Sequence, residues 1–232
     1  MSITTISNPS TPSSSSRQID RLQPNESGII DSVLLKLQNF QSKKDLGTLC
    51  IGIASCDDNV GVTTIAIRLA TQAAESGFGN VLLVDGNSEK PTIHRAFRLK
   101  RSPGMVDHIC DGVDLSDCIQ ETGIPELQIL SWGSKDSAAS SVSPLTLKPL
   151  FNDLRSRYQW VILDLPTIDG SGYGLFFANH TDGVVLVVDA VQSRAHNSKK
   201  LLRLLEENSI EVIGAILNRF TPTLPKWLRR WF

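Results

Sequence analysis

The chain has 232 residues, enough for one sizeable hydrophobic core, and carries a formal net charge of -1. This charge argues against a nucleic-acid partner, because binding to a phosphate backbone needs a strongly basic surface. No apolar run approaches the roughly 18 residues of a membrane span, and the N-terminus lacks a secretory layout, so we expect a cytoplasmic protein. The cysteines show no CxxC spacing, which predicts neither a zinc site nor a disulfide framework: Cys50, Cys56, Cys110 and Cys118.

The N-terminal part of the chain divides into a polar leader and a helical segment. Residues 1–27 are rich in Ser, Thr and Pro and hold too few apolar side chains to offset the entropy of ordering, which predicts a disordered leader. Residues 28–44 carry Ile30, Val33, Leu34 and Leu37 at helical spacing, which predicts an amphipathic helix. Its apolar face packs on its own domain or on a partner, and we favour the first.

Residues 45–221 alternate short apolar runs with helical patterns, as in a βαβ series of one domain. Runs that are apolar at consecutive positions are buried on both faces, so the sequence predicts an α/β fold with a mostly parallel sheet and helices on both faces. Ligands bind such sheets beyond the carboxyl ends of the strands. The predicted strands are TLCIGIAS, VLLVD, LQIL, WVILDLP, GVVLVVDA and EVIGAILN, with helices at 63–75, near Thr92, at 147–157 and at 195–207.

A polar loop, residues 55–64, joins the first of these strands to a helix. It turns at Gly61 and enters a first helical turn that contains Thr63 and Thr64. A strand, a turn and a helix N-terminus form an anion site, because unpaired backbone N–H groups and the helix dipole converge there. The alternative is an ordinary turn capped by threonine, since Val62 stands where the GxxxxGK[ST] pattern has lysine and Asn59 where it has an earlier glycine.

Asp57 and Asp58 place two carboxylates in this loop, where we expect them to face bound phosphates. A carboxylate about 8 Å from a phosphate charge costs about 2 kcal/mol at an effective dielectric constant near 20. The loop is therefore predicted to hold ATP poorly, although Thr63 keeps the hydroxyl that would bind Mg²⁺.

Two further aspartates end predicted buried strands, Asp85 in VLLVD and Asp164 in WVILD. Carboxylates at this edge of a sheet can hold Mg²⁺ and position a nucleophile. The alternative is that either aspartate caps the turn after it. We expect Thr63, Asp85 and Asp164 to form a magnesium site.

Three segments carry a family resemblance that extends from Asp45 to Phe220. The chain resembles the cytoplasmic domain of bacterial tyrosine kinases of capsule and exopolysaccharide synthesis, within the MinD/ParA group of P-loop ATPases. The resemblance implies a P-loop NTPase-like fold that binds ATP or ADP with Mg²⁺. The segments are VLLVDGNSEKPTIHRAFRLKRSPGMVDHICDGVDLSDCIQETGIPELQILSWG, RYQWVILDLPTIDGSGYGLFFANHTDGVVLVVDAVQSR and VIGAILNRF.

The resemblance also implies roles for individual residues. This sequence departs from the family at four positions where the family has a charged side chain. It implies catalytic roles for Asp85 and Asp164, an adenine contact at Asn218, and a nucleotide-binding loop at Gly61, Val62, Thr63 and Thr64. The family's lysine, second Walker A′ aspartate, following arginine and later aspartate are here Val62, Asn87, Glu89 and Tyr173.

Three functions follow as alternatives. The first is a catalytically impaired kinase-like regulator of exopolysaccharide or capsule synthesis that binds a transmembrane polysaccharide co-polymerase, with a homo-oligomer as a further expectation. The second is an active ATPase or tyrosine kinase in which Lys90 or Arg95 replaces the missing lysine. The third is a MinD-like positioning module at a membrane.

The last segment, residues 222–232, is basic and aromatic. In a helix its apolar side chains share one face and its cations flank them, as in an interfacial membrane anchor, and it is similar to the tail of MinD-type ATPases. The alternative is a terminal helix docked on the protein's own sheet. The apolar residues are Trp227, Leu228, Trp231 and Phe232, and the cations are Lys226, Arg229 and Arg230.

Overall fold

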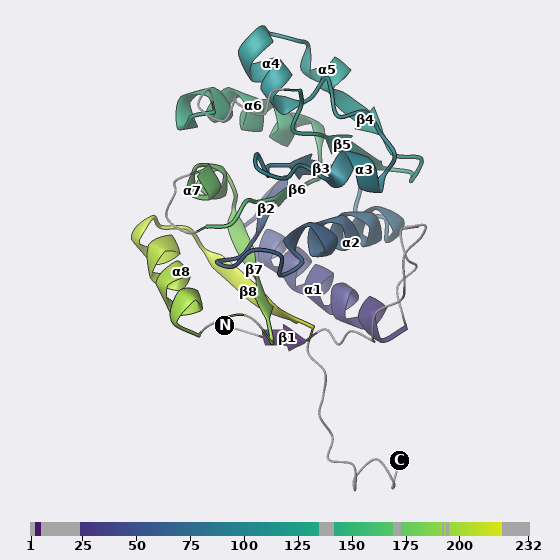
Figure 1. Cartoon of the computed structure of the whole chain (residues 1–232). Coiled ribbons are helices and arrows are strands. Elements are labelled where there is room, and N and C mark those ends of the chain that lie inside the picture. The colour runs from purple at the N-terminus through teal and green to yellow at the C-terminus, as the bar shows by residue number, and fades with distance from the viewer. Residues whose placement is uncertain are drawn as a thin grey trace, which may run out of the picture.

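The computed structural model describes residues 3–5, 24–134, 142–168, 173–191, 193 and 195–219. Within these residues one sheet has the order β1-β8-β7-β2-β6-β3-β5-β4, and its pairings are parallel except that of β4 with β5 (Figure 1). The predicted mostly parallel sheet is confirmed. The strands are β1 (Ile3–Thr5), β2 (Leu49–Ala54), β3 (Val81–Asp85), β4 (Ile119–Glu121), β5 (Leu127–Leu130), β6 (Trp160–Asp164), β7 (Gly183–Asp189) and β8 (Val212–Asn218).

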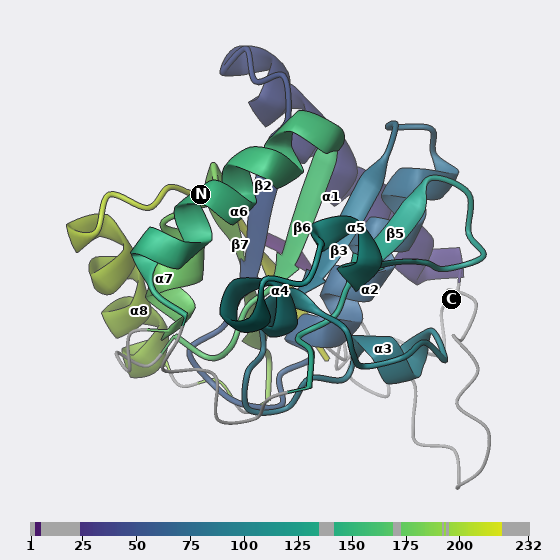
Figure 2. The same ribbon diagram turned by 90° about the horizontal axis from the view of Figure 1, so that it is seen from above.

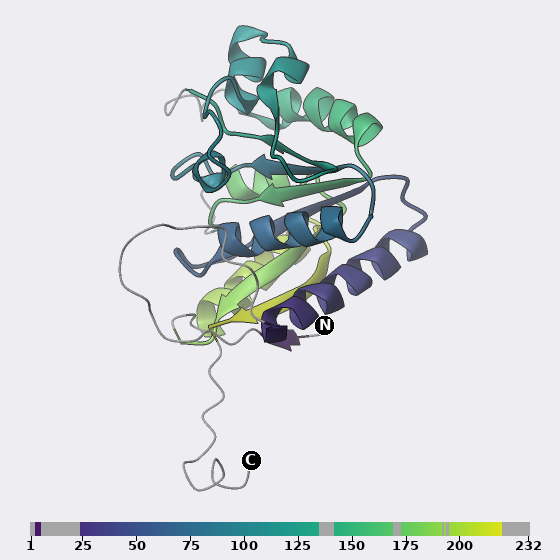
Figure 3. The same cartoon turned by 90° about the vertical axis from the view of Figure 1, so that its right-hand side faces the viewer.

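Helices cover both faces of the sheet, as predicted. Figure 2 shows α6 in front of β2 and β6, with α1 behind them, and Figure 3 shows α1 and α2 side by side. No helix among the described residues is long and apolar enough to cross a bilayer. The helices are α1 (Pro24–Lys43), α2 (Val62–Glu75), α3 (Ile93–Ala96), α4 (Met105–Asp111), α5 (Leu115–Cys118), α6 (Pro144–Arg157), α7 (Tyr173–Ala178) and α8 (Ala195–Glu207).

The central strands explain the continuous apolar runs of the sequence. Every residue of β2, β3 and β6 is buried, because a strand with helices on both faces has no solvent-facing side. One hydrophobic core lies between the sheet and α1, α2 and α3, and a second lies between the sheet and α4 to α8. The carboxyl ends of β3 and β6 then meet at one edge, with Asp85 beside Asp164.

The N-terminal region differs from the prediction in two respects. Helix α1 begins at Pro24, earlier than the predicted range of 28–44. Its apolar face packs in the core of its own domain, the alternative favoured above. Ile3–Thr5, within the predicted disordered leader 1–27, pairs with β8. Without this pairing, the edge of β8 would expose unpaired backbone groups. Ile3, Thr4 and Thr5 are β-branched and therefore suit a strand, although the leader as a whole has a composition typical of disorder. The remaining leader and the tail at 222–232 lie outside the described residues.

A partly buried ion pair fastens α6 to the start of β7. The Arg155 guanidinium donates to both carboxylate oxygens of Asp182 at 3.0 Å, and one of these oxygens also accepts from the backbone N–H of Cys50 at 2.7 Å. We predict that Asp182→Ala lowers the free energy of unfolding by about 2 kcal/mol, because it leaves a half-buried guanidinium unpaired. Urea denaturation measures this. As a control, Glu211→Ala breaks the exposed pair with Lys44 and should cost less than about 0.5 kcal/mol; equal losses would contradict the prediction.

Candidate functional site

The loop between β2 and α2 has the strand, turn and helix geometry of an anion site. Gly61 precedes α2 with a φ of 98°, and the first turn of the helix has neither a side-chain cap nor an acidic residue. The N–H groups of this turn are therefore open to an anion. A Cβ at Gly61 would also collide with the side-chain amide of Asn218, so only glycine fits this position.

Two residues at the end of β8 hold this loop. Asn218 donates from Nδ2 to the carbonyl of Val60 at 2.7 Å. The Arg219 guanidinium donates to the carbonyl of Asn59 at 2.9 Å and to the fully buried carboxylate of Asp189 at 2.7 Å. Asn218, which the resemblance implies as an adenine contact, thus tethers the loop through its amide. Arg219 was missed at the sequence level, although its place directly after a predicted strand was a signal.

The Thr63 hydroxyl faces the end of β6. It donates to Oδ2 of Asp164 at 2.7 Å, while Oδ1 of Asp164 is buried and has no partner among the described residues. Burial first, and then the neighbouring charge of Asp85, raise the pKa of Asp164 well above its usual range. An unpaired buried oxygen beside a threonine hydroxyl fits a cation or a water molecule.

Asp85 has a different environment from Asp164. Its two carboxylate oxygens accept hydrogen bonds from the backbone N–H groups of Asn87 at 3.3 Å and Ile93 at 3.1 Å. Burial nevertheless raises its pKa to about 6. Asp85 therefore organises the turn after β3, the alternative weighed above, while lying next to Asp164. No three His, Cys, Asp or Glu side chains in the described part of the chain converge on a metal position. Magnesium bound at Thr63 and Asp164 would therefore need phosphate or water oxygens as further ligands.

A cleft of about 550 Å³ opens in front of the loop. Val62 lies on its wall and also packs on the core beneath α2, so the position expected for a lysine is apolar. Lys90 lines the cleft, whereas Arg95 is not among the described residues that do. The lining residues are 57–64 of the loop, Asn87, Glu89, Lys90, Thr92, Leu165, Thr167 and Arg219.

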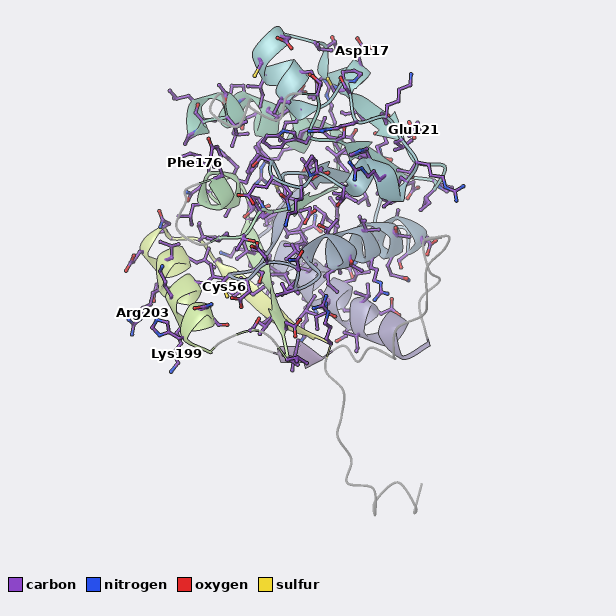
Figure 4. All side chains as sticks on the ribbon, viewed as in Figure 1. Cys56, Asp117, Glu121, Phe176, Lys199 and Arg203 are labelled. Carbon is purple, nitrogen blue, oxygen red and sulfur yellow. The ribbon has the colours of Figure 1, made fainter. Side chains whose placement is uncertain are left out.

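The two loop carboxylates both have hydrogen-bond partners. Asp57 accepts from the side-chain amide of Asn197, on α8, at 2.8 Å, and Asp58 accepts from the Thr167 hydroxyl. The prediction placed both carboxylates facing bound phosphate. The structure keeps them in the wall of the cleft but engages each of them with a neighbouring segment. The neighbouring Cys56, which is labelled in Figure 4, also contacts α8. Its sulfur lies 3.9 Å from the Ser198 hydroxyl.

Comparisons with known proteins show which proteins this chain is similar to. No protein-family profile matches the chain. Over 160 residues it is 28% identical to the putative tyrosine-protein kinase CapB of Staphylococcus aureus, which covers 68% of this chain and 70% of CapB. Its structure matches that of the chimerical protein CapA2B2 with a TM-score of 0.81 and 26% identity, over 94% of this chain and 93% of that one. The chain is a relative of the bacterial tyrosine-protein kinases.

The same fold extends to MinD, as the resemblance implied. The MinD protein of Pyrococcus horikoshii, solved with Mg-ADP, aligns with a TM-score of 0.67 and 22% identity, over 79% of this chain and 76% of that one. This likeness establishes the P-loop NTPase-like fold. In this chain the loop frame, Thr63 and Asp164 lie together, and Val62 stands where the GxxxxGK[ST] pattern has lysine.

The buried pair of Asp85 and Asp164 should make stability depend on pH. The pKa of the Asp85 carboxyl rises from 3.8 to about 6 on folding. Its protonated form therefore stabilises the folded protein below the unfolded pKa, and this stabilisation is lost as the pH rises through about 6. Burial raises the pKa of Asp164 in the same direction, so we predict that Asp164→Asn raises the free energy of unfolding near neutral pH and changes it little near about pH 4. The amide keeps an oxygen for the Thr63 hydroxyl.

Urea denaturation of both proteins across this pH range measures the effect. Asp153→Asn serves as the control, since Asp153 is partly exposed and paired with Arg157 on the same helix. A destabilised Asp164→Asn protein with an unchanged pH slope would show that the pair carries no such penalty.

Proposed function

We propose that this kinase relative binds nucleotide weakly, transfers phosphate poorly or not at all, and regulates the synthesis or export of capsule or exopolysaccharide through a membrane co-polymerase. The observation that carries the proposal is Val62 at the first position of α2, on the wall of the cleft. A lysine ammonium about 4 Å from a phosphate oxygen contributes about 4 kcal/mol at an effective dielectric constant near 20. Valine contributes nothing of this kind.

The charges around the cleft support the same conclusion. Asp57, Asp58 and Glu89 line it with carboxylates, against the cations of Lys90 and Arg219. The Arg219 guanidinium is already engaged by Asp189 and by the loop carbonyl of Asn59. The field that a nucleotide triphosphate meets is therefore less favourable than in a loop with its own lysine.

The tyrosines also limit self-phosphorylation. The chain has two, Tyr158 and Tyr173. Tyr158 is 6% exposed and its hydroxyl donates to the side chain of Gln128. Burial raises the pKa of this hydroxyl to about 12, so it is a poor nucleophile. Tyr173 is half-buried at the start of α7 and stacks edge-on with Phe176.

One observation favours the alternative of an active ATPase or kinase. Thr63 and Asp164 keep the hydroxyl and carboxylate that would hold Mg²⁺, and Oδ1 of Asp164 has no described partner. In that case Lys90, which lines the cleft, would supply the missing charge. The MinD-like alternative depends mainly on the tail at 222–232, which lies outside the described residues.

Calorimetry with ATP and Mg²⁺ tests the proposal on the wild type and on Val62→Lys. We expect the lysine to tighten binding by about tenfold or more, because it places an ammonium group at the open N-terminus of α2. Val62→Met is the matched control: it has similar length without charge and should leave binding unchanged.

Two results would overturn the proposal. One is tight binding by the wild type that Lys90→Ala abolishes, which would establish a substitute cation. The other is steady phosphate release by the wild type at rates that Asp164→Asn removes. Failure of both the wild type and Val62→Lys to bind would mean that the acidic wall, rather than the missing lysine, closes the cleft.

A further inference from the structure

Two hollows lie side by side at the carboxyl edge of the sheet. The first is the cleft of about 550 Å³ in front of the loop, and the second encloses about 350 Å³. The second is lined by Cys56, Ser88, Pro166 and Tyr173, none of which lines the first. The residues that line both hollows form the partition between them: Asp57, Asp58, Glu89 and Thr167.

A hydrogen bond within this partition joins two segments at the mouth of the cleft. The Thr167 hydroxyl donates to Oδ1 of Asp58, which is exposed. Asp58 belongs to the loop between β2 and α2, and Thr167 to the segment that follows β6. The same two segments are joined more deeply by the bond from Thr63 to the buried Asp164. The two bonds therefore close the loop and this segment into a ring that borders the cleft.

The acidic end of the loop is also held from the side of α8. Asn197 donates to a carboxylate oxygen of Asp57 at 2.8 Å, and the backbone N–H of Asp57 donates to the Ser55 hydroxyl at 3.1 Å. Asp57 directly precedes Asp58 in the chain. With its neighbour fixed in this way, Asp58 stays in the partition as long as Thr167 binds it.

We propose that the hydrogen bond between Asp58 and Thr167 is an autoinhibitory clasp, which must open before a nucleotide triphosphate enters the cleft. A phosphate group that binds the N-terminus of α2 has to pass the Asp58 carboxylate, which repels it. The clasp fixes that carboxylate in the wall and ties together the two segments beside the entrance. Asp58 is exposed and Thr167 half-buried, so the bond is weak enough to open in solution.

The clasp deepens the proposed function and rests on it, since it assumes a cleft that accepts nucleotide. Val62 determines how tightly a phosphate is held once it is bound. The clasp determines how often the cleft is open to receive it. The two effects are separable, because one is measured as an affinity and the other as an association rate.

Stopped-flow mixing with the methylanthraniloyl derivative of ATP and Mg²⁺ measures how fast the cleft fills. The parent protein is Val62→Lys, whose lysine should tighten binding, and the wild type is measured beside it. Thr167→Val removes the donor of the clasp and leaves the charge of Asp58, so we expect the association rate to rise about fivefold. Asp58→Ala opens the same clasp, and adding Thr167→Val to it should raise the rate no further.

Two matched variants separate the clasp from other effects of substitution. Thr167→Ser keeps a hydroxyl at the position and should restore the parent rate to within about twofold. Thr181→Val removes a threonine hydroxyl that donates to the carbonyl of Ala178, next to the start of β7 and at the opposite edge of the sheet, and should leave the rate unchanged. Circular dichroism and urea midpoints establish that each variant is folded.

An association rate that Thr167→Val leaves unchanged or lowers overturns the clasp. If Asp58→Asn raises the rate in the same series, the charge of Asp58 alone guards the cleft. A full second increase in the double variant, or no binding by the parent and by every opened variant, overturns the clasp as well. The proposed function fails separately, through the affinity of the wild type, because the clasp is measured as the ratio of each variant to its parent.

Discussion

The hydrogen bond from Thr63 to Asp164 joins the end of the loop at residues 55–64 to the sheet. Its geometry depends on the parallel placement of β2 beside β6. Because neighbouring parallel strands end at the same edge, Thr63, two residues after the loop glycine, meets the last residue of β6. Asp85 reaches the same edge through β3. Burial of these strands on both faces makes the arrangement rigid. It also makes the two carboxylates costly to ionise, which raises their pKa values.

The cleft at this edge has the backbone geometry of an anion site but no lysine in its loop. The loop retains its turn at Gly61 and the open N-terminus of α2, so the backbone half of an anion site is intact. The side-chain half is altered, since Val62 brings no cation. Arg219 approaches from β8 but binds the loop carbonyl and Asp189. This arginine stabilises the loop conformation, including the left-handed φ of 57° at Asn59, without leaving a free positive charge.

Helix α8 connects two surfaces of this kinase relative. Its inner side contacts the loop through Asn197 and Ser198, and its outer side carries exposed cations together with the carboxylates of Glu206 and Glu207. The apolar packing of Leu201 and Leu205 holds the helix in this orientation.

The amino-acid sequence by itself determined the sheet type, the strand, turn and helix frame of the loop at residues 55–64, and both strand-end aspartates, because continuous apolar runs and local turns are recorded in neighbouring residues. It did not reveal α4, α5 and α7, whose short patterns lack a clear period. Only the tertiary structure decided the partners of the loop. Asn197, Asn218 and Arg219 lie 140, 158 and 160 residues from their contacts at Asp57, Val60 and Asn59. Such contacts are set by the order of strands in the sheet, which no local spacing encodes.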